Sequence, residues 1–256
     1  MGRWTGLLRI LPKNENEIGK VYDFLADAKS RNVMRNLLQY KISRDPRLIE
    51  EIRDPVEWQY FDPNIVKLGS RENFLDLGAY IGDSITAFCQ RVNGEYQSII
   101  ALEPSQRSYK RLLETTCYMQ NVVCYSYGVG EKDGMMKFLE ESTQTSMVSE
   151  AGTATIGIRS IDSLLPDKRI SFIKADIEGM EKEMLRGAKC LIRKNIPILA
   201  LSVYHKKEDI FQIPIMVKEM HPDYSIYMRH YTGSSVDTVL YAVDERGSFR
   251  NGAGRN

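Results

Sequence analysis

Long hydrophobic runs and an excess of one charge are both absent from this sequence of 256 residues. No stretch approaches the roughly 18 consecutive apolar residues that a membrane-spanning helix needs. The short apolar stretch at residues 7–11 contains Arg9 and is too short for a signal peptide. A formal net charge of +1 gives no basis for binding nucleic acid or an anionic membrane surface. We therefore expect a soluble cytoplasmic protein with no stable membrane insertion and no nucleic-acid partner.

Cysteine and histidine are scarce as well. The four cysteines, Cys89, Cys117, Cys124 and Cys190, form no C-x-x-C pair, and no H-E-x-x-H motif is present. These absences argue against a zinc site and against the iron–sulfur cluster of a radical enzyme. Scattered single cysteines are typical of thiols in a reducing compartment, which agrees with a cytoplasmic location.

The composition that remains is that of a globular protein, with 43% hydrophobic and 27% charged residues, and the length suits one domain with additions. Patterns with helical spacing come first, at residues 18–25, 33–38 and 48–52. We predict an N-terminal helical cap or lid at residues 1–62 and a main domain at residues 63–246. The Gly-, Arg- and Asn-rich residues 247–256 predict a flexible tail.

Short apolar runs alternate with helical stretches in the main domain. The expected strands are residues 73–77, 98–102, 122–127, 170–174, 196–203, 224–228 and 238–243, and the expected helices are residues 83–92, 105–117, 180–191 and 215–220. A short extra strand is expected at 135–139, followed by a Ser-, Thr- and Gly-rich loop. The alternation predicts a mostly parallel sheet covered by helices, and the last connection is short enough to require an antiparallel hairpin. The predicted fold class is therefore a Rossmann-like α/β domain with a seven-stranded sheet, the arrangement of class I methyltransferases.

The first motif is FLDLGAYIGDS at residues 74–84, where a strand ends in an acid and a glycine-rich turn opens a helix. Gly78 would let the backbone approach a ligand closely, and the N–H groups at the helix start favour a carboxylate or a phosphate. Asp76 would repel a pyrophosphate but suits the amino group and sulfonium of a methionine moiety. The spacing is also G-x-x-x-G and not the dinucleotide pattern, so S-adenosyl-L-methionine is favoured over NAD. The cofactor-binding residues predicted here are Asp76, Gly78, Ala79, Tyr80, Gly82, Asp83 and Ser84.

A second acid, Glu103, closes the next expected strand and is followed by Pro104. A carboxylate at this place can accept both ribose hydroxyls of a nucleoside, which adenosylmethionine and NAD share. Ligands of such sheets bind beyond the carboxyl ends of the strands. Glu103, Pro104 and Gly128, which follows the third strand, are therefore predicted to contact the cofactor.

The third motif is FIKADIEGME at residues 172–181. Asp176 and Glu178 alternate with Lys174, so all three side chains point the same way if the strand continues that far. Asp176 is a candidate for both cofactor binding and catalysis, and Glu178 for catalysis. The structural alternative is an ion pair between Lys174 and one of the acids that follow it.

Three stretches together resemble the FkbM family of methyltransferases: residues 74–84, the block ISFIKADIEGMEKEMLRGA at 170–188, and RHYTGSSVDTVLYA at 229–242. The similarity spans about residues 60 to 245. It implies an adenosylmethionine-dependent O-methyltransferase acting on a hydroxyl of a sugar, a glycan or a natural product.

Transfer to a hydroxyl benefits from a positioned base. His205 and His230 follow or end strands at the ligand edge, so they join Asp176 and Glu178 as candidates, whereas His221 is expected to be structural. Asp176, Glu178 and His205 could alternatively hold a divalent metal ion, although we expect no metal site.

Two other functions stay open at this point. One is a non-catalytic adenosylmethionine-binding protein, and the other is an NAD-dependent oxidoreductase. The expected partner is a small-molecule or glycan acceptor, whose hydroxyls would suit the Ser and Thr side chains of the loop at 140–157. Neither the acceptor nor the oligomeric state follows from the sequence.

Overall fold

A computed structural model describes residues 14–139, 147–148 and 154–245 of the chain. Contacts divide the chain into two compact units: a central unit, Val66–Leu201, and a terminal unit, which joins Met1–Ile65 to Ser202–Asn256. The predicted tail at 247–256 and most of the predicted loop at 140–157 lie outside the described residues. No helix of the described part is long and apolar enough to span a membrane.

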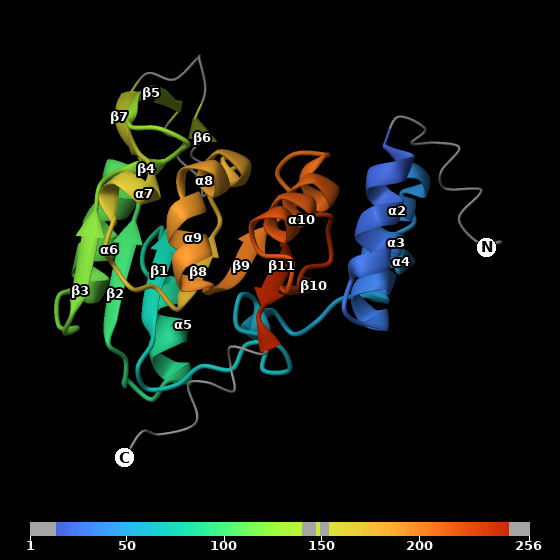
Figure 1. The fold of residues 1–256 in the computed structure, drawn as a ribbon, viewed down its shortest axis with the longest axis horizontal. Helices are drawn as coiled ribbons and strands as arrows, with labels where there is room; N and C mark the ends of the chain where they lie inside the picture. Colours follow the sequence, from blue (N-terminus) through green and yellow to red (C-terminus); the bar gives the residue numbers. More distant parts are fainter. Residues whose placement is uncertain (1–13, 140–146, 149–153, 246–256) are drawn as a thin grey trace. The chain divides into compact units, whose positions relative to one another are not determined.

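The central unit is built on parallel strands whose residues are mostly buried, except in the edge strand Val122–Tyr125. Its strands are β1 (Asn73–Leu77), β2 (Ser98–Leu102), β3 (Val122–Tyr125), β8 (Phe172–Ala175) and β9 (Ile198–Ser202). β1 pairs in parallel with β2 and β8, and the ladder continues from β2 to β3 and from β8 to β9. Figure 1 shows β3, β2, β1 and β8 following one another in this order. Continuous apolar runs are the expected sequence of strands buried on both faces.

The helices of the central unit are α5 (Asp83–Arg91), α6 (Gln106–Thr116), α7 (Ile161–Leu164), α8 (Glu181–Gly187) and α9 (Lys189–Asn195). α5 packs on β1 through Phe88, whose ring stacks on Phe74 with 4.6 Å between centroids. The single helix predicted at 180–191 is wrong in one respect, because the structure divides it into two helices at Ala188.

A second, four-stranded sheet lies between β3 and β8 in the sequence, with strand order β4-β7-β5-β6. Its strands are β4 (Gly128–Val129), β5 (Gly134–Leu139), β6 (Met147–Val148) and β7 (Ala154–Arg159). The sequence predicted β5 but not the other strands. An ideal Cβ on Gly187 would lie 2.1 Å from the carbonyl oxygen of Gly130, so only glycine lets the end of α8 approach the segment after β4.

The terminal unit combines the N-terminal helices with a C-terminal hairpin. Its elements are α2 (Glu15–Phe24), α3 (Ala28–Ser43), α4 (Arg47–Glu50), η1 (Val56–Trp58), α10 (Asp209–Met220), β10 (Ser225–His230) and β11 (Thr238–Val243). Arg229 on β10 donates to Asp27 at 2.6 Å and to Asp62 at 3.2 Å. Residues 1–62 were predicted to form a cap or lid on the main domain, and these bounds stay a prediction. The contacts of Arg229 join this segment to the hairpin.

The seven-stranded sheet has the order β10-β11-β9-β8-β1-β2-β3. β10 and β11 pair antiparallel, as the short connection between them predicted. The predicted α/β class, with a mostly parallel sheet and a C-terminal antiparallel hairpin, is confirmed.

Candidate cofactor and active site

The turn after β1 is built from alternating left-handed residues. Gly78, Tyr80 and Gly82 have φ values of +74°, +47° and +88°. The N–H groups of Gly78 and Ala79 both donate to Leu102 O at 3.0 Å. We call residues 78–82 the cofactor turn. Because its first N–H groups are used inside the protein, the groups available to an anion are those at the start of α5, which has no side-chain cap.

The constraint that requires glycine at position 78 comes from a neighbouring loop of the protein, whereas the prediction from the sequence attributed it to a ligand. An ideal Cβ at this position would lie 1.9 Å from the carbonyl oxygen of Asp176. The space that the missing side chain leaves is therefore filled by the neighbouring loop after β8 and not by a ligand. The glycine lets these two loops touch.

Asp76 is fully buried, and both of its carboxylate oxygens have partners in the protein. Lys174 Nζ lies 3.0 Å from Oδ1, and the Ser84 hydroxyl donates to Oδ2. Lys174 also donates to the carbonyl oxygen of Gly78 at 2.6 Å. The register of β1 and β8 places Asp76 directly opposite Lys174. An ion pair of Lys174 was predicted as an alternative, but with the acids of its own motif, whereas the structure pairs it with Asp76.

The two charges of this pair shift each other's pKa. Burial raises the pKa of Asp76, and the Lys174 ammonium and the Ser84 hydrogen bond oppose that rise. Burial alone would lower the pKa of Lys174, but the charges of Asp76 and Asp176 raise it overall. Lys174 is therefore a buried cation whose charge is stabilised by the acids around it.

Glu103 is held differently. Its Oε2 accepts from Tyr80 N and its Oε1 from Ser105 N, both at 2.8 Å. Burial raises the pKa of Glu103 to about 7, against the opposing effect of these two backbone N–H groups. A carboxylate has about four acceptor sites, so each oxygen keeps the capacity to accept one more hydrogen bond.

Two other predicted residues lie next to this carboxylate. Pro104 follows it, and an ideal Cβ on Gly128 would lie 3.8 Å from Pro104 Cβ. The structure thus brings together Tyr80, Glu103, Pro104 and Gly128 from the ends of β1, β2 and β3. Asp83 is exposed, whereas the Ser84 side chain is buried and directed to Asp76.

The loop after β8 departs from the predicted alternation. Asp176 N still donates to Leu77 O at 3.0 Å, as a continuing strand would. Glu178 and Gly179 then adopt left-handed φ values of +55° and +89°, which ends the extended chain. The condition for Glu178 to alternate with Lys174, a strand that continues that far, is therefore not met, because β8 ends at Ala175. A left-handed residue other than glycine is strained by about 1–3 kcal/mol, and such strain is commonest at functional sites.

Glu181 closes this loop and was not among the predicted site residues. It is fully buried in the first turn of α8, and its Oε1 accepts from Ile177 N at 3.0 Å. We call residues 176–181 the acidic loop. An acid in the first turn of a helix that reaches back to a preceding N–H group is a recognisable sequence pattern, which could have pointed to this role.

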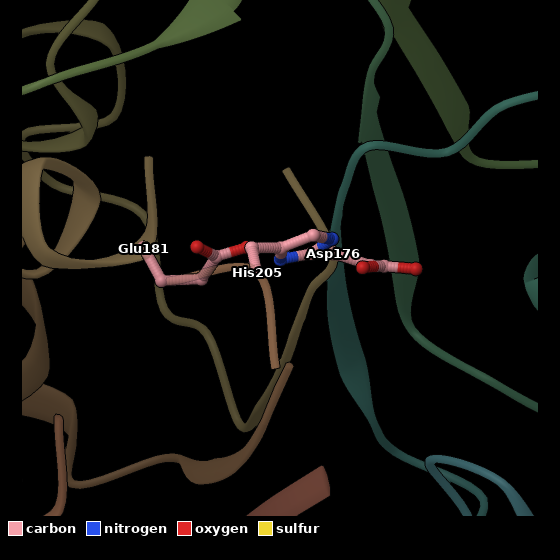
Figure 2. Close-up of side chains that lie close together, drawn as sticks. All are labelled: Asp176, Glu181 and His205. Atoms are coloured by element: carbon pink, nitrogen blue, oxygen red, sulfur yellow. The ribbon is translucent and has the colours of Figure 1, made fainter. Parts of the chain in front are cut away.

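Figure 2 shows the side chains of Asp176 and Glu181 from the acidic loop. One carboxylate oxygen of each lies within 4.8 Å of the other. Two carboxylates at such a separation could hold a divalent cation, although acidic groups are common without one. His205, which is drawn in the same view, follows β9 and belongs to the terminal unit.

The candidate histidines differ in exposure. His205 is half-buried, with its ring centroid 4.1 Å from that of Tyr204. His230 is fully buried, and its Nδ1 lies 2.9 Å from Thr238 Oγ1. Burial lowers the pKa of His230, which favours the neutral ring at neutral pH. His221, expected to be structural, lies 3.1 Å from Asp244 through Nε2.

A protein-family model described as the methyltransferase FkbM domain matches residues 76–233, which is more than half of the chain. No curated protein sequence matches at a significant level. The crystal structure of methyltransferase FkbM from Methylobacillus flagellatus KT is similar, with a TM-score of 0.80 and 25% sequence identity. The match covers 94% of this chain but only 60% of that one.

Fibrillarin of Aeropyrum pernix, in complex with natively bound S-adenosyl-L-methionine, is a more distant likeness. It has 11% identity and a TM-score of 0.44, over 73% of this chain and 76% of that one. The family match, the seven-stranded sheet and the acids at its carboxyl edge lead to one assignment. The chain belongs to the FkbM methyltransferase family.

Proposed function

We propose that this protein transfers the methyl group of S-adenosyl-L-methionine to a hydroxyl of a sugar, a glycan or a natural product. Family membership supports methyl transfer. The observation that carries the proposal is Glu103, a buried carboxylate at the end of β2 that two backbone N–H groups hold and that keeps acceptor capacity. A cytoplasmic location and a small-molecule or glycan acceptor belong to the same proposal.

The residues present fit this cofactor. Glu103 would accept the ribose hydroxyls, with Pro104 and Gly128 beside the nucleoside. The start of α5, at Asp83 and Ser84, would face the carboxylate of the methionine moiety. The positive φ of Tyr80, a residue other than glycine, supports a ligand role for the cofactor turn, because such strain persists mainly at binding sites. When bound, the cofactor supplies an electrophilic methyl group on a sulfonium.

The protein's own task in catalysis is to orient the acceptor and to remove its proton. Asp176 and Glu178 in the acidic loop, and His205 after β9, are the groups we propose for these roles. His230 is fully buried, so its part is to position the end of β10 through Thr238. A base with access to the acceptor oxygen would take up the proton of the acceptor hydroxyl.

Calorimetric titration with S-adenosylhomocysteine tests the cofactor, and NAD serves as the control ligand. We expect micromolar binding of the former and none of the latter. Methyl transfer from labelled donor to a panel of sugars and polyketide alcohols then tests the acceptor class, with Asp176→Asn as the inactive control. Binding of NAD alone would indicate an oxidoreductase. Binding of S-adenosylhomocysteine with no transfer to any hydroxyl acceptor would favour a non-catalytic binding protein.

A further inference from the structure

The cofactor turn and the acidic loop, which follow two neighbouring strands, are in direct contact. Leu77 O accepts from Asp176 N at 3.0 Å. The carbonyl oxygen of Asp176 occupies the place where Gly78 would carry a Cβ, 1.9 Å from that position. A shift of either loop along the sheet edge would therefore break a backbone hydrogen bond or force a steric clash.

The side chain of Lys174 connects the strands that carry the two loops. It is 4% exposed, and its ammonium group reaches Asp76 Oδ1 at 3.0 Å and the carbonyl oxygen of Gly78 at 2.6 Å. It stands at the end of β8, two residues before Asp176, whose charge also acts on it. Lys174 therefore links the two loops. Its ammonium group binds Gly78, the first residue of the cofactor turn, and its backbone belongs to β8, the strand that leads into the acidic loop.

We propose that Lys174 is a positioning residue that couples the cofactor turn to the acidic loop, and so aligns the methionine end of the cofactor with Asp176. This inference rests on the proposed function, because it names the part of the bound cofactor that the coupling serves. The nucleoside end is held by Glu103, directly after β2, and depends less on Lys174. Its Oε2 accepts from Tyr80 N in the cofactor turn, but its Oε1 accepts from Ser105 N, which lies outside both loops.

If this ion pair only stabilised the fold, two apolar residues could take its place. Replacing a buried pair by apolar residues of similar volume is often neutral or stabilising, so charge neutralisation alone does not explain a lysine here. This ammonium donates to the carbonyl oxygen of Gly78 and forms an ion pair with Asp76, so it contacts two different groups of the β1 end. The hydrogen bond from Lys174 to Gly78 is not needed to neutralise Asp76, so it points to a role beyond the ion pair.

The test removes both charges together, in Asp76→Asn/Lys174→Met, so that no buried charge is left unpaired. The matched control is Asp167→Asn/Lys194→Met, which removes an exposed pair of the same unit with 3.6 Å between the charged atoms. Two readouts are compared with the parent: hydrogen exchange of the ligand-free protein, and calorimetric affinity for S-adenosylhomocysteine and for adenosine.

We expect amide exchange in residues 78–82 and 176–181 to become at least tenfold faster in the Asp76→Asn/Lys174→Met variant, with other segments as in the parent. We expect affinity for S-adenosylhomocysteine to fall at least tenfold, while affinity for adenosine changes less than threefold. The control variant should match the parent in every readout.

Parent-like exchange in either loop would overturn the coupling. An equal loss of affinity for S-adenosylhomocysteine and adenosine would overturn the assignment to the methionine end. If the parent itself does not bind S-adenosylhomocysteine, the proposed function fails. The exchange rates still decide then whether Lys174 couples the two loops.

Discussion

Asp76 and Glu103 end neighbouring strands of one sheet, and the sequence assigned both of them to the cofactor. The structure shows that the two acids have different partners. Asp76 has partners in Lys174 and Ser84 and is fully buried, whereas Glu103 is held by two backbone N–H groups and keeps acceptor capacity. We therefore propose different tasks for these two acids at the carboxyl edge of the sheet: Asp76 shapes the site, and Glu103 contacts the ligand.

The largest effect is expected from Asp76→Asn, because it leaves the Lys174 ammonium buried without its main counter-charge. Breaking a buried ion pair by removing one partner costs about 3–5 kcal/mol. We expect the free energy of unfolding in urea to fall by this amount. The Asp76→Asn/Lys174→Met variant should recover most of the loss, and a single variant as stable as the parent would contradict the structural role of Asp76.

Glu103→Gln is expected to weaken ligand binding more than stability. The amide offers one acceptor oxygen instead of two and directs N–H donors toward the N–H groups of Tyr80 or Ser105. We expect affinity for S-adenosylhomocysteine to fall about 10- to 100-fold, or about 1.4–2.7 kcal/mol, by calorimetry at pH 8. Glu95→Gln, at an exposed position of the same unit, is the control and should bind like the parent.

The comparison can be sharpened with pH, because the pKa of Glu103 is raised to about 7 by burial. Only the ionised carboxylate accepts on both oxygens, so affinity for S-adenosylhomocysteine should rise as the pH increases from 6 to 8. The expected gain is about fivefold to tenfold. Glu103→Gln should abolish this dependence, and a parent affinity that is flat over the range would contradict the role of Glu103.

The same raised pKa has a consequence for stability. The folded state holds the Glu103 proton more tightly than the unfolded chain does, so its stabilising effect is present below about pH 4.5 and is lost as the pH rises through about 7. Unfolding of the parent and of Glu103→Gln across this range separates the contribution of Glu103 from those of other groups.

The smallest effect is expected from Ser84→Ala. This change removes the hydroxyl that donates to Asp76 and keeps the backbone N–H of Ser84, which is the group we place against the ligand. We expect a loss of about 1–3 kcal/mol in the free energy of unfolding, because a buried acceptor loses a partner. Affinity for S-adenosylhomocysteine should change less than threefold, and a tenfold loss would mean that the Ser84 side chain contacts the cofactor.

Much of the fold could be predicted because apolar runs bounded by turn residues mark buried strands. β1, β2 and β11 begin and end where the sequence predicted. The small second sheet was largely missed, since β4 has two residues and β7 follows a Ser- and Thr-rich stretch typical of a loop. α10 starts earlier than predicted because it continues through Pro214, a residue that usually ends a helix.

The rule that ligands bind beyond the carboxyl ends of parallel strands predicted a site at the turn after β1, Glu103 and the acidic loop, and that location stays a prediction. The pairings between these residues did not follow from the sequence. The partner of Lys174 could not be predicted, because it depends on β1 and β8 being neighbours in the sheet. The left-handed turn at Glu178 was equally hidden, since glutamate rarely adopts that conformation.

A crystal structure of the protein with bound S-adenosylhomocysteine tests the central comparison most directly. We predict that both ribose hydroxyls donate to the Glu103 carboxylate, while Asp76 stays paired with Lys174 and Ser84 and makes no contact with the ligand. A complex in which Asp76 leaves Lys174 to bind the ligand, or in which Glu103 makes no contact with the ribose, would contradict this account.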